Sequence, residues 1–410
     1  MKNVCFREMK ETGRSYWLVQ GLLAIVILLG LAAAHHMETA GHWITGMNNQ
    51  IVWGLPHVFA VFLIVTASGE LNLASIASVF GKAPYKPLSR LSALVAIAHL
   101  VGGLMILVLD LGRPDRLPVA ITNFNLKSIF TWNIVLYSGF IVLAGVYLWT
   151  MMERRFNLYT KFAGLGVFIW RIILTTGTGS IFGFLVARDA YNAAIMAPMF
   201  IILSFSYGTA IYLMTLETLS YWGQRPIGEE LITRLKNLLG IFIGAAFYFF
   251  LAYHATNLYI AQRQGVEYFL LGGSNLYSQM FWVGQIFIGT AIPLALLYGP
   301  LARFRLIIFL ACILVVIGGL AQMYVTIIGG QAYPLTIFPG YEASSSFFDG
   351  QVGQYVPTIY EAMLGISGFA VAAFVVILAT RMLPFIPDSL ADADIDERLV
   401  VKGSNEALST

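Results

Sequence analysis

The chain of 410 residues is far more hydrophobic than a soluble protein of its size. Hydrophobic residues make up 58% of it and charged residues 11%, and its mean hydropathy is +0.77. Soluble domains contain about 25% charged residues. This composition excludes soluble and disordered classes and predicts a polytopic membrane protein that contacts lipid. The net charge of +3 gives no indication of nucleic-acid binding.

Ten apolar segments are each long enough to cross a bilayer as an α-helix. Such a helix needs about 20 residues, whereas barrel strands would have about 10 residues of alternating polarity. The sequence therefore predicts an all-α fold, and the helix count suits two four-helix bundles flanked by the first and last helices. The expected spans are 16–34, 51–80, 88–109, 129–152, 162–186, 194–219, 238–260, 281–301, 306–328 and 362–383.

Lys and Arg are distributed unevenly between the two sides of these spans. Eighteen fall on the side of the N-terminus and five on the other side. Because cytoplasmic loops carry the excess of Lys and Arg, both termini are expected in the cytoplasm. The chain then divides into a cytoplasmic tail (1–15), a membrane domain (16–383) and an acidic cytoplasmic tail (384–410).

The cysteine count limits the redox groups that this chain can hold. Cys5 and Cys312 are its only cysteines, too few for a C-x-x-C-H haem site or a cysteine-ligated iron–sulfur cluster. His99 and His254 lie at poorly matched depths for the axial ligands of a b-type haem. We therefore expect no haem, iron–sulfur cluster or other metal on this chain, so that any redox metal belongs to a partner.

Six ionisable side chains lie within these apolar segments or near their ends. Ionisable groups in a bilayer are costly and normally mark a path for protons, ions or a redox substrate. The alternative interpretation is structural, with histidines that hydrogen-bond between helices and an ion pair between a buried Glu and a buried Arg. The six residues are His57, Glu70, His99, Arg171, Glu217 and His254.

The segment after the third span, 110–116, concentrates two acids and two arginines where cations are otherwise scarce. The guanidinium of Arg113 offers a planar fork of donors that suits carbonyl or carboxylate oxygens. Asp110 ends the helix that carries His99 and is placed to exchange protons with it through water or a substrate. A local salt-bridge turn is the alternative.

The string from Leu109 to Pro114, set between two membrane helices, resembles the NrfD/PsrC family of cofactor-free quinone-reacting membrane subunits. Glu70, Arg171 and Glu217 fall where members of the polysulfide-reductase type have a buried acid, a buried arginine and a second acid proposed to carry protons. Ten helices, the Trp53-Gly54-Leu55-Pro56-His57 string and the loop after residue 332 make the chain similar to the DsrP branch, part of the DsrMKJOP complex of dissimilatory sulfur metabolism.

The resemblance implies a quinone pocket near the outer face, beside a periplasmic ferredoxin-like iron–sulfur subunit. It also implies a multihaem cytochrome c and further membrane subunits as partners, in a bacterial or archaeal cytoplasmic (inner) membrane. The chain would be an electron-transfer subunit linked to menaquinone or ubiquinone rather than a stand-alone enzyme. The expected quinone-binding residues are His57, His99, Asp110, Arg113 and His254, and the expected proton path is Glu70, Arg171, Ser180 and Glu217.

Three of these residues agree with a quinone pocket by position alone. His57, Asp110 and His254 fall within about 10 Å of one membrane depth at 1.5 Å per helical residue. Imidazole suits the proton exchange that quinone chemistry needs near neutral pH. The alternatives are a secondary transporter, or the membrane anchor of a polysulfide, tetrathionate or molybdopterin-type reductase.

The outer loop 329–361 lacks Lys and Arg and is rich in aromatic residues and proline. Loops of this length without secondary structure are usually functional or disordered, and this composition argues against disorder. It is expected either to dock another subunit or to plug the protein's own helices.

Overall fold

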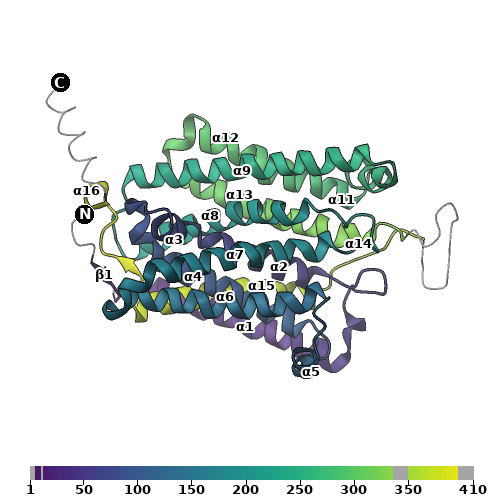
Figure 1. Ribbon diagram of the computed structural model, residues 1–410, viewed down its shortest axis with the longest axis horizontal. Coiled ribbons are helices and arrows are strands. Elements are labelled where there is room, and N and C mark those ends of the chain that lie inside the picture. Colours follow the sequence, from purple (N-terminus) through teal and green to yellow (C-terminus); the bar gives the residue numbers. More distant parts are fainter. Residues whose placement is uncertain (1–4, 11–12, 336–349, 396–410) are drawn as a thin grey trace.

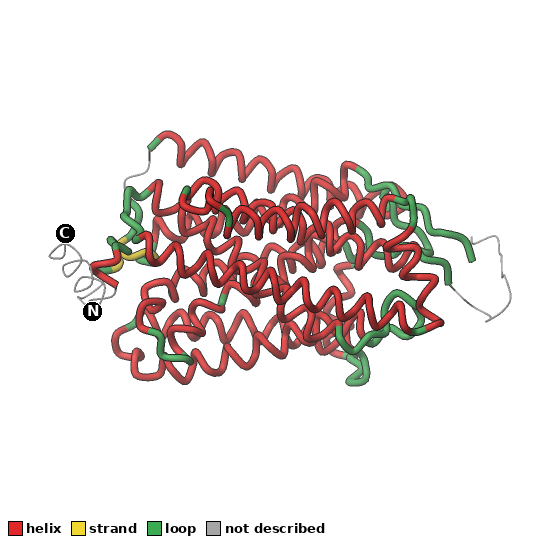
Figure 2. Tube along the Cα trace, turned by 90° about the horizontal axis from the view of Figure 1, so that it is seen from above, coloured by secondary structure: helices red, strands yellow, loops and turns green. Residues whose placement is uncertain are grey.

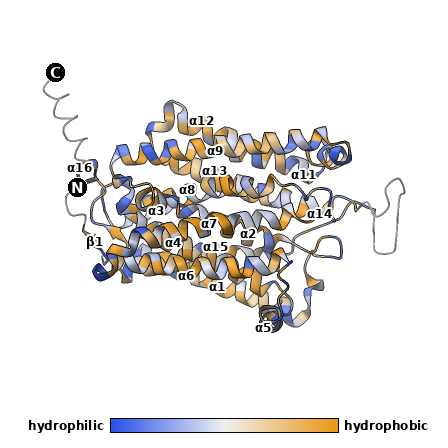
Figure 3. Ribbon diagram, in the orientation of Figure 1, coloured by the Kyte–Doolittle hydropathy of each residue, from blue (hydrophilic) through white to orange (hydrophobic). Residues whose placement is uncertain are grey.

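The computed structural model of the protein describes residues 5–10, 13–335 and 350–395. In this part of the chain, ten helical segments are long and apolar enough to cross a membrane. They run along the long axis of the molecule with the loops at its two ends (Figures 1 and 2). Apolar residues dominate the middle and hydrophilic residues gather toward the ends (Figure 3). The all-α, multi-pass membrane fold predicted from the sequence is confirmed.

Seven spans are single helices and three are composite. The single helices are α1 (Arg14–Ala40), α4 (Ser89–Leu109), α6 (Ile129–Met152), α7 (Thr160–Gly183), α8 (Met196–Trp222), α9 (Glu229–Tyr259) and α15 (Ile359–Met382). The composite spans are α2 (Leu55–Glu70) with α3 (Asn72–Ser78); α11 (Leu276–Gln279), π-helical η7 (Met280–Ala291) and α12 (Ile292–Tyr298); and α13 (Arg305–Tyr324), π-helical η9 (Val325–Gly329) and α14 (Gly330–Ala332).

Short elements connect the spans. They are β1 (Phe6–Arg7), η1 (His42–Ile44), η2 (Ala83–Leu88), η3 (Pro114–Arg116), α5 (Leu117–Thr122), η4 (Arg154–Tyr159), η5 (Ala261–Arg263), α10 (Gln264–Glu267), η6 (Tyr268–Gly272), η8 (Pro300–Arg303), β2 (Ile386–Pro387) and α16 (Asp392–Ile395). Strands β1 and β2 pair antiparallel, so the first and last described segments lie at the same end of the molecule (Figure 1). We call it the terminal end, and the opposite end, with residues 41–54 and 110–128, the loop end.

The spans pack as two bundles that contact each other along several helices. Helices α2, α4, α6 and α7 form the first bundle, and α8, α9, η7 with α12, and α13 form the second. Helices α1 and α15 pack on each other, and α15 also packs on α2 and α4. The two bundles meet where α2 and α7 contact α8 and where α2 contacts α13.

The π-helix in the eighth span has a local cause. Pro293 lacks an N–H, and its ring clashes with the carbonyl four residues earlier in a regular α-helix. A wider helical turn before it relieves that clash. In agreement, the Thr290 hydroxyl donates to the Gln285 carbonyl five residues earlier, at 3.1 Å.

The contact between α2 and α8 depends on two glycines. A Cβ added to Gly69 would overlap the carbonyl oxygen of Ser204, and one added to Gly208 would overlap the backbone of Gly69. Small residues let membrane helices approach this closely and gain van der Waals packing. The two backbones therefore leave no room for a side chain at this crossing.

We expect Gly69→Ala to lower the thermal unfolding midpoint strongly, because the methyl group would push α2 away from α8 at a cost of about 3 kcal/mol. The measurement is thermal unfolding of the purified chain in lipid nanodiscs, followed by tryptophan fluorescence. Gly166→Ala in α7 is the matched control, since nothing lies within 4 Å of a Cβ there. Equal midpoints for the two variants would contradict a close-packed crossing.

Candidate functional site

A cavity of about 420 Å³ lies at the loop end of the first bundle. We call it the large cavity. Its wall is mostly apolar, and His57, Asn133 and Tyr137 supply most of its polar groups. Clefts of this size with few polar groups are typical of small-molecule sites. The lining residues are Trp53, His57, Val61, Leu104, Leu107, Val108, Leu111, Leu117, Ile121, Phe130, Asn133, Ile134, Tyr137, Ser138, Ile181, Phe182 and Ile327.

Asp110 lies between two histidines beside this cavity. Its Oδ2 is 2.9 Å from His57 Nδ1, and its Oδ1 is 3.7 Å from His42 Nε2. The carboxylate is fully buried, whereas both imidazoles are partly exposed. His57 lines the large cavity, and His42 and Asp110 line an open pocket of about 310 Å³ at the loop end. The three residues, which we call the His57–Asp110–His42 bridge, thus join the cavity to the outer pocket.

Local sequence explains this placement. Helix α4 ends at Leu109, so Asp110 occupies its C-cap, and Gly112 follows with φ +70 in the left-handed region that favours glycine. The segment before α2 is extended and is held by Gln331, whose Oε1 accepts from the N–H groups of Val52 and Trp53 at 3.0 Å each. His57, in the first turn of α2, is therefore held at a fixed position opposite the end of α4.

The charges within the bridge stabilise one another. Burial raises the pKa of Asp110, but its contacts with His42 and His57 outweigh burial and hold that pKa below its ordinary value. The contact with Asp110 raises the pKa of His42 above its ordinary value despite partial burial. The arrangement therefore favours an ionised carboxylate next to a protonated imidazole.

Arg113, expected in the same site, lies outside it. Its guanidinium makes two hydrogen bonds of 3.0 Å to Asp115, and its side chain is 64% exposed. It is not among the residues that line the large cavity. In this state of the chain, Arg113 and Asp115 form the local salt-bridge turn that the sequence left as the alternative.

His99 is paired with Glu70 in the interior of the first bundle. His99 Nδ1 lies 3.0 Å from Glu70 Oε1 and 3.0 Å from the Val95 carbonyl oxygen, and both side chains are buried. His99 does not line the large cavity. The structure thus brings together one expected quinone-binding residue and one residue of the expected proton path.

The structural alternative for these residues, an ion pair between Glu70 and Arg171, is not found, because Glu70 lies beside His99 instead. Arg171 is fully buried in α7, donates to the Ser68 carbonyl at 3.0 Å, and lies over the rings of Phe168 and Phe205. Among the described residues no carboxylate lies within ion-pair distance of it. Two residues correspond to about 200° around a helix, so Ser68 faces α7 while Glu70 faces α4.

The other two residues of the expected proton path lie apart from this cluster. Ser180 is buried on α7, about two and a half helical turns beyond Arg171 toward the loop end. Glu217 lies on α8 near the terminal end, where its Oε1 is buried without a hydrogen-bond partner in the described part of the chain. The structure therefore shows separate polar groups rather than one continuous contact chain.

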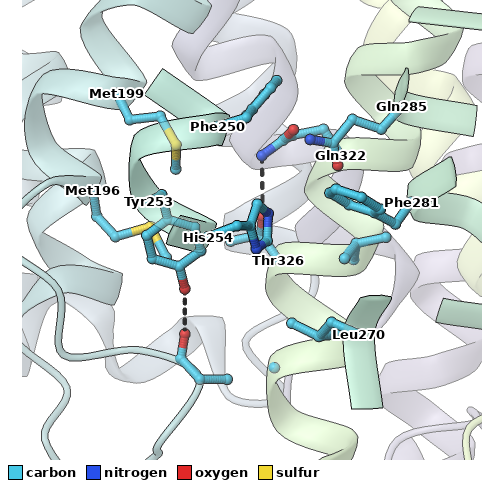
Figure 4. Close-up of a pocket in the computed structure, with 13 residues that line it drawn as sticks. Met196, Met199, Phe250, Tyr253, His254, Leu270, Phe281, Gln285, Gln322 and Thr326 are labelled. Atoms are coloured by element: carbon cyan, nitrogen blue, oxygen red, sulfur yellow. Dashed lines mark hydrogen bonds between the residues drawn. The ribbon is translucent and has the colours of Figure 1, made fainter. Parts of the chain in front are cut away.

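His254 lies in the second bundle, away from His57. Its Nδ1 is 2.6 Å from Oε2 of Glu267, and the other oxygen of Glu267 accepts from Asn257 at 2.8 Å. His254 lines a separate cavity of about 20 Å³, which Figure 4 shows together with Gln285 and Gln322. A shared membrane depth, as the sequence predicts for these residues, does not determine which bundle a side chain faces.

Several site residues were not anticipated from the sequence. Asn133 and Tyr137 are spaced four residues apart on an apolar helix, which places them on one face and was a usable signal. His42 and Glu267 lie in connections between spans, where polar residues are ordinary. Nothing in the sequence distinguished them.

The described end of the outer loop packs on the chain itself. Glu361, buried in the first turn of α15, accepts from the N–H groups of Gly46 and Thr358 and from the hydroxyl of Tyr355. Tyr355 in turn accepts from the N–H of Leu55 at 2.6 Å. Most of the aromatic part of the loop, from Phe338 to Phe348, lies outside the described residues, and so does the possible docking cap.

We expect the stabilising effect of His42 to depend on pH. Because its pKa is raised in the folded protein, its ion pair with Asp110 contributes fully below the ordinary histidine pKa of about 6.5 and is lost as pH rises through the raised value. The lowered pKa of Asp110 keeps the carboxylate ionised down to about pH 4. His42→Gln should therefore lower the unfolding midpoint most near pH 5 to 6 and least at alkaline pH.

The measurement is the midpoint difference between wild type and His42→Gln across this pH range in nanodiscs. His35→Gln is the control, since His35 is exposed near the same end of α1. A difference for His42→Gln that stays constant with pH would show that the imidazole is neutral throughout.

Comparison with known proteins places the chain among membrane subunits of oxidoreductases. It is 28% identical to the Hdr-like menaquinol oxidoreductase integral membrane subunit of Archaeoglobus fulgidus, over 96% of this chain and 99% of the relative. It is 26% identical to a proposed dimethyl sulfoxide reductase membrane subunit of Halobacterium salinarum, over 93% and 94%. It is 23% identical to the menaquinone reductase integral membrane subunit of Nitratidesulfovibrio vulgaris, over 87% and 89%.

The family described as polysulphide reductase, NrfD, matches residues 43–334. This match covers eight of the ten spans and includes both bundles and the large cavity. It also includes His57 and Asp110 of the bridge, whereas His42 lies one residue before it. The chain therefore belongs to the NrfD family.

Proposed function

We propose that this chain is the quinone-reacting membrane subunit of a multi-subunit oxidoreductase. The observation that carries the proposal is the large cavity. Its wall is mostly apolar but includes His57, which is paired with the buried Asp110. The relatives named for menaquinol and menaquinone support the same substrate class. Family membership favours this function over a secondary transporter.

The cavity suits a quinone ring in size and chemistry. Its aromatic and aliphatic side chains can cover the ring faces, while His57, Asn133 and Tyr137 are able to hydrogen-bond the two ring oxygens. Oxidation of a quinol releases two electrons and two protons, and reduction of a quinone takes up the same numbers. Imidazole changes its protonation near neutral pH and is therefore the lining group best suited to that exchange.

The bridge gives the exchanged protons a route to the loop end. A proton accepted by His57 is stabilised by the Asp110 carboxylate, and His42 on the other oxygen of that carboxylate faces the outer pocket. Through this route, quinone chemistry would exchange protons with the loop end. In our proposal that end faces the periplasm, because Lys and Arg are concentrated at the terminal end.

We also propose a proton path from the terminal end. It consists of Glu70, paired with His99, together with Arg171, Ser180 and Glu217. Buried ionisable groups in a membrane domain support this role, and water would have to bridge the gaps between them. The electrons would pass to or from a periplasmic ferredoxin-like iron–sulfur subunit, with a multihaem cytochrome c in the complex. Membership of the DsrP branch, and hence a role in sulfur metabolism in the cytoplasmic membrane, rests on the sequence resemblance.

A second candidate is a membrane subunit that passes electrons from quinol to a terminal reductase. The likeness to the proposed dimethyl sulfoxide reductase subunit of Halobacterium salinarum favours it. Both candidates use the same quinone site and differ in the partner. Purification of the intact complex from native membranes, with identification of its subunits by mass spectrometry, distinguishes them.

We expect the purified chain in nanodiscs to bind a short-chain naphthoquinone. Binding should quench the fluorescence of Trp53, because this residue lies in the wall of the large cavity. His57→Leu should weaken binding about tenfold, since a hydrogen bond to an ionisable group contributes about 1.5 kcal/mol. Titration of tryptophan fluorescence measures the affinity, and Trp53→Phe identifies the reporting residue.

His254→Gln is the matched control for this titration, because His254 is also paired with a buried carboxylate but lies in the second bundle. It should leave the affinity unchanged. If His57→Leu binds the naphthoquinone as tightly as wild type, the large cavity is not the quinone site. If His254→Gln weakens binding equally, the site lies between the bundles.

A further inference from the structure

The second bundle contains two small cavities with polar walls. The first, which we call the histidine cavity, is lined by His254, Gln285, Gln322 and Thr326 among mostly apolar residues. The second, the serine cavity, is lined by Ser206, Tyr207, Gln285 and Thr290. Each has a volume of about 20 Å³. Gln285 and Phe250 belong to both walls, so the two cavities are neighbours.

Two glutamines in these walls have unsatisfied polar atoms. Gln285 Nε2 and Gln322 Oε1 are buried without a hydrogen-bond partner in the described part of the chain, and the two side chains are only 3% and 4% exposed. Figure 4 shows both amides at the histidine cavity. An unpaired buried amide costs roughly 1 to 3 kcal/mol, and such groups normally bind ordered water.

The volumes and the polar groups together indicate water. A cavity needs about 10 to 15 Å³ to hold one water molecule, and buried waters usually make 2 to 4 hydrogen bonds. One cavity supplies an amide donor, an amide acceptor and the Thr326 hydroxyl, and the other adds the hydroxyls of Ser206, Tyr207 and Thr290. Each cavity therefore has the room and the partners for one water.

His254 and Glu267 form a pair that borders the histidine cavity. Nδ1 of His254 is occupied by the fully buried Glu267, which leaves Nε2 as the ring atom available to a cavity water. Asn257 bonds the other oxygen of Glu267, and Arg263 donates to Asn257 at 2.9 Å and to the carbonyl of Asn192. This network fixes the carboxylate and connects the pair to the loop end.

The π-helical segment η9 separates the histidine cavity from the large cavity. Val325 and Thr326 line the former, and Ile327, the next residue, lines the latter. Consecutive residues of a helix point in different directions, so one turn of η9 borders both spaces. π-helical turns of this kind are frequent at functional sites.

We propose that the second bundle contains a hydrated proton site, in which two bound waters connect the His254–Glu267 pair through Gln285 and Gln322 to the middle of the membrane. A proton moves along it by exchange of N–H and O–H hydrogens between His254 Nε2 and the waters. No other bond changes and no oxidant is required. The link between this site and quinone chemistry rests on the proposed function, whereas the water site itself does not.

The first test measures water occupancy in the full chain in nanodiscs. X-ray radiolysis in oxygen-18 water should label Met199 and Phe281, which line the histidine cavity, at rates typical of residues next to bound water. Gln285→Leu with Gln322→Leu should reduce that labelling at least about fivefold, because the water loses two hydrogen-bond partners. Unchanged labelling in the double variant would overturn the proposal.

Gln20→Leu is the matched control, since Gln20 is also buried with an unpaired Oε1 but lies on α1. It should leave the labelling of Met199 and Phe281 at the wild-type rate. Loss of labelling in this control as well would mean that the effect is a general destabilisation, and would remove the support for the water site.

The second test follows the proton. In NMR spectra of the chain labelled with nitrogen-15 histidine, the ring N–H signal of His254 is identified as the one that His254→Gln removes. The hydrogen of this signal should exchange with deuterium faster in wild type than in the double leucine variant. Equal rates would show that the waters do not carry the exchange.

In proteoliposomes with the intact complex, His254→Gln or Glu267→Gln should lower proton uptake per quinone reduced at unchanged quinone affinity. An unchanged ratio would reduce the site to structural water, whereas absent quinone turnover in wild type would instead contradict the proposed function.

Discussion

Helix α2 is enclosed by protein on nearly all sides, and this constraint determines where the polar groups of the fold can lie. Almost every residue of α2 is buried, because α4, α7, α8, α13 and α15 all pack on it. Such enclosure is possible only where backbones approach closely, as at Gly69 and Gly208. No lipid or bulk water is then available to the buried side chains of α2, which lie beyond its first turns. Each of its polar groups must be satisfied by a neighbouring helix or pay the cost of an unsatisfied group.

The helical period distributes these polar groups among different neighbours. Ser68 contacts Arg171 and Thr175 on α7, while Glu70 turns to His99 on α4. At the start of the same helix, His57 meets Asp110 at the end of α4. The two histidine–carboxylate pairs between α2 and α4 thus lie at different depths along one helix contact. The outer pair borders a cavity, which gives it access to a ligand, whereas the inner pair is enclosed.

The sequence predicted the spans and their number well, because each span is an apolar run of sufficient length. It also identified the ionisable residues, since charge stands out within such runs. It could not predict their partners: His57 and His254 were placed at one depth, but depth leaves the rotation of each helix and its bundle undetermined. The partners His42 and Glu267 lie in connections, where a charged residue carries no signal. Pro293 marks a position where a regular α-helix is distorted, but a single residue does not specify a π-helix, and the sequence predicted an unbroken eighth span.

The second bundle also supports the geometry of the first. Gln331 on α14 accepts from the backbone of Val52 and Trp53 and donates to the carbonyls of Trp53 and Ile327. One side chain therefore fixes the approach to His57 relative to η9, which forms part of the wall of the large cavity. A shift of η9 would move both Ile327 in that wall and Thr326 in the histidine cavity. Because a packed interior transmits such shifts, we expect a displacement of this turn to change the walls of both cavities.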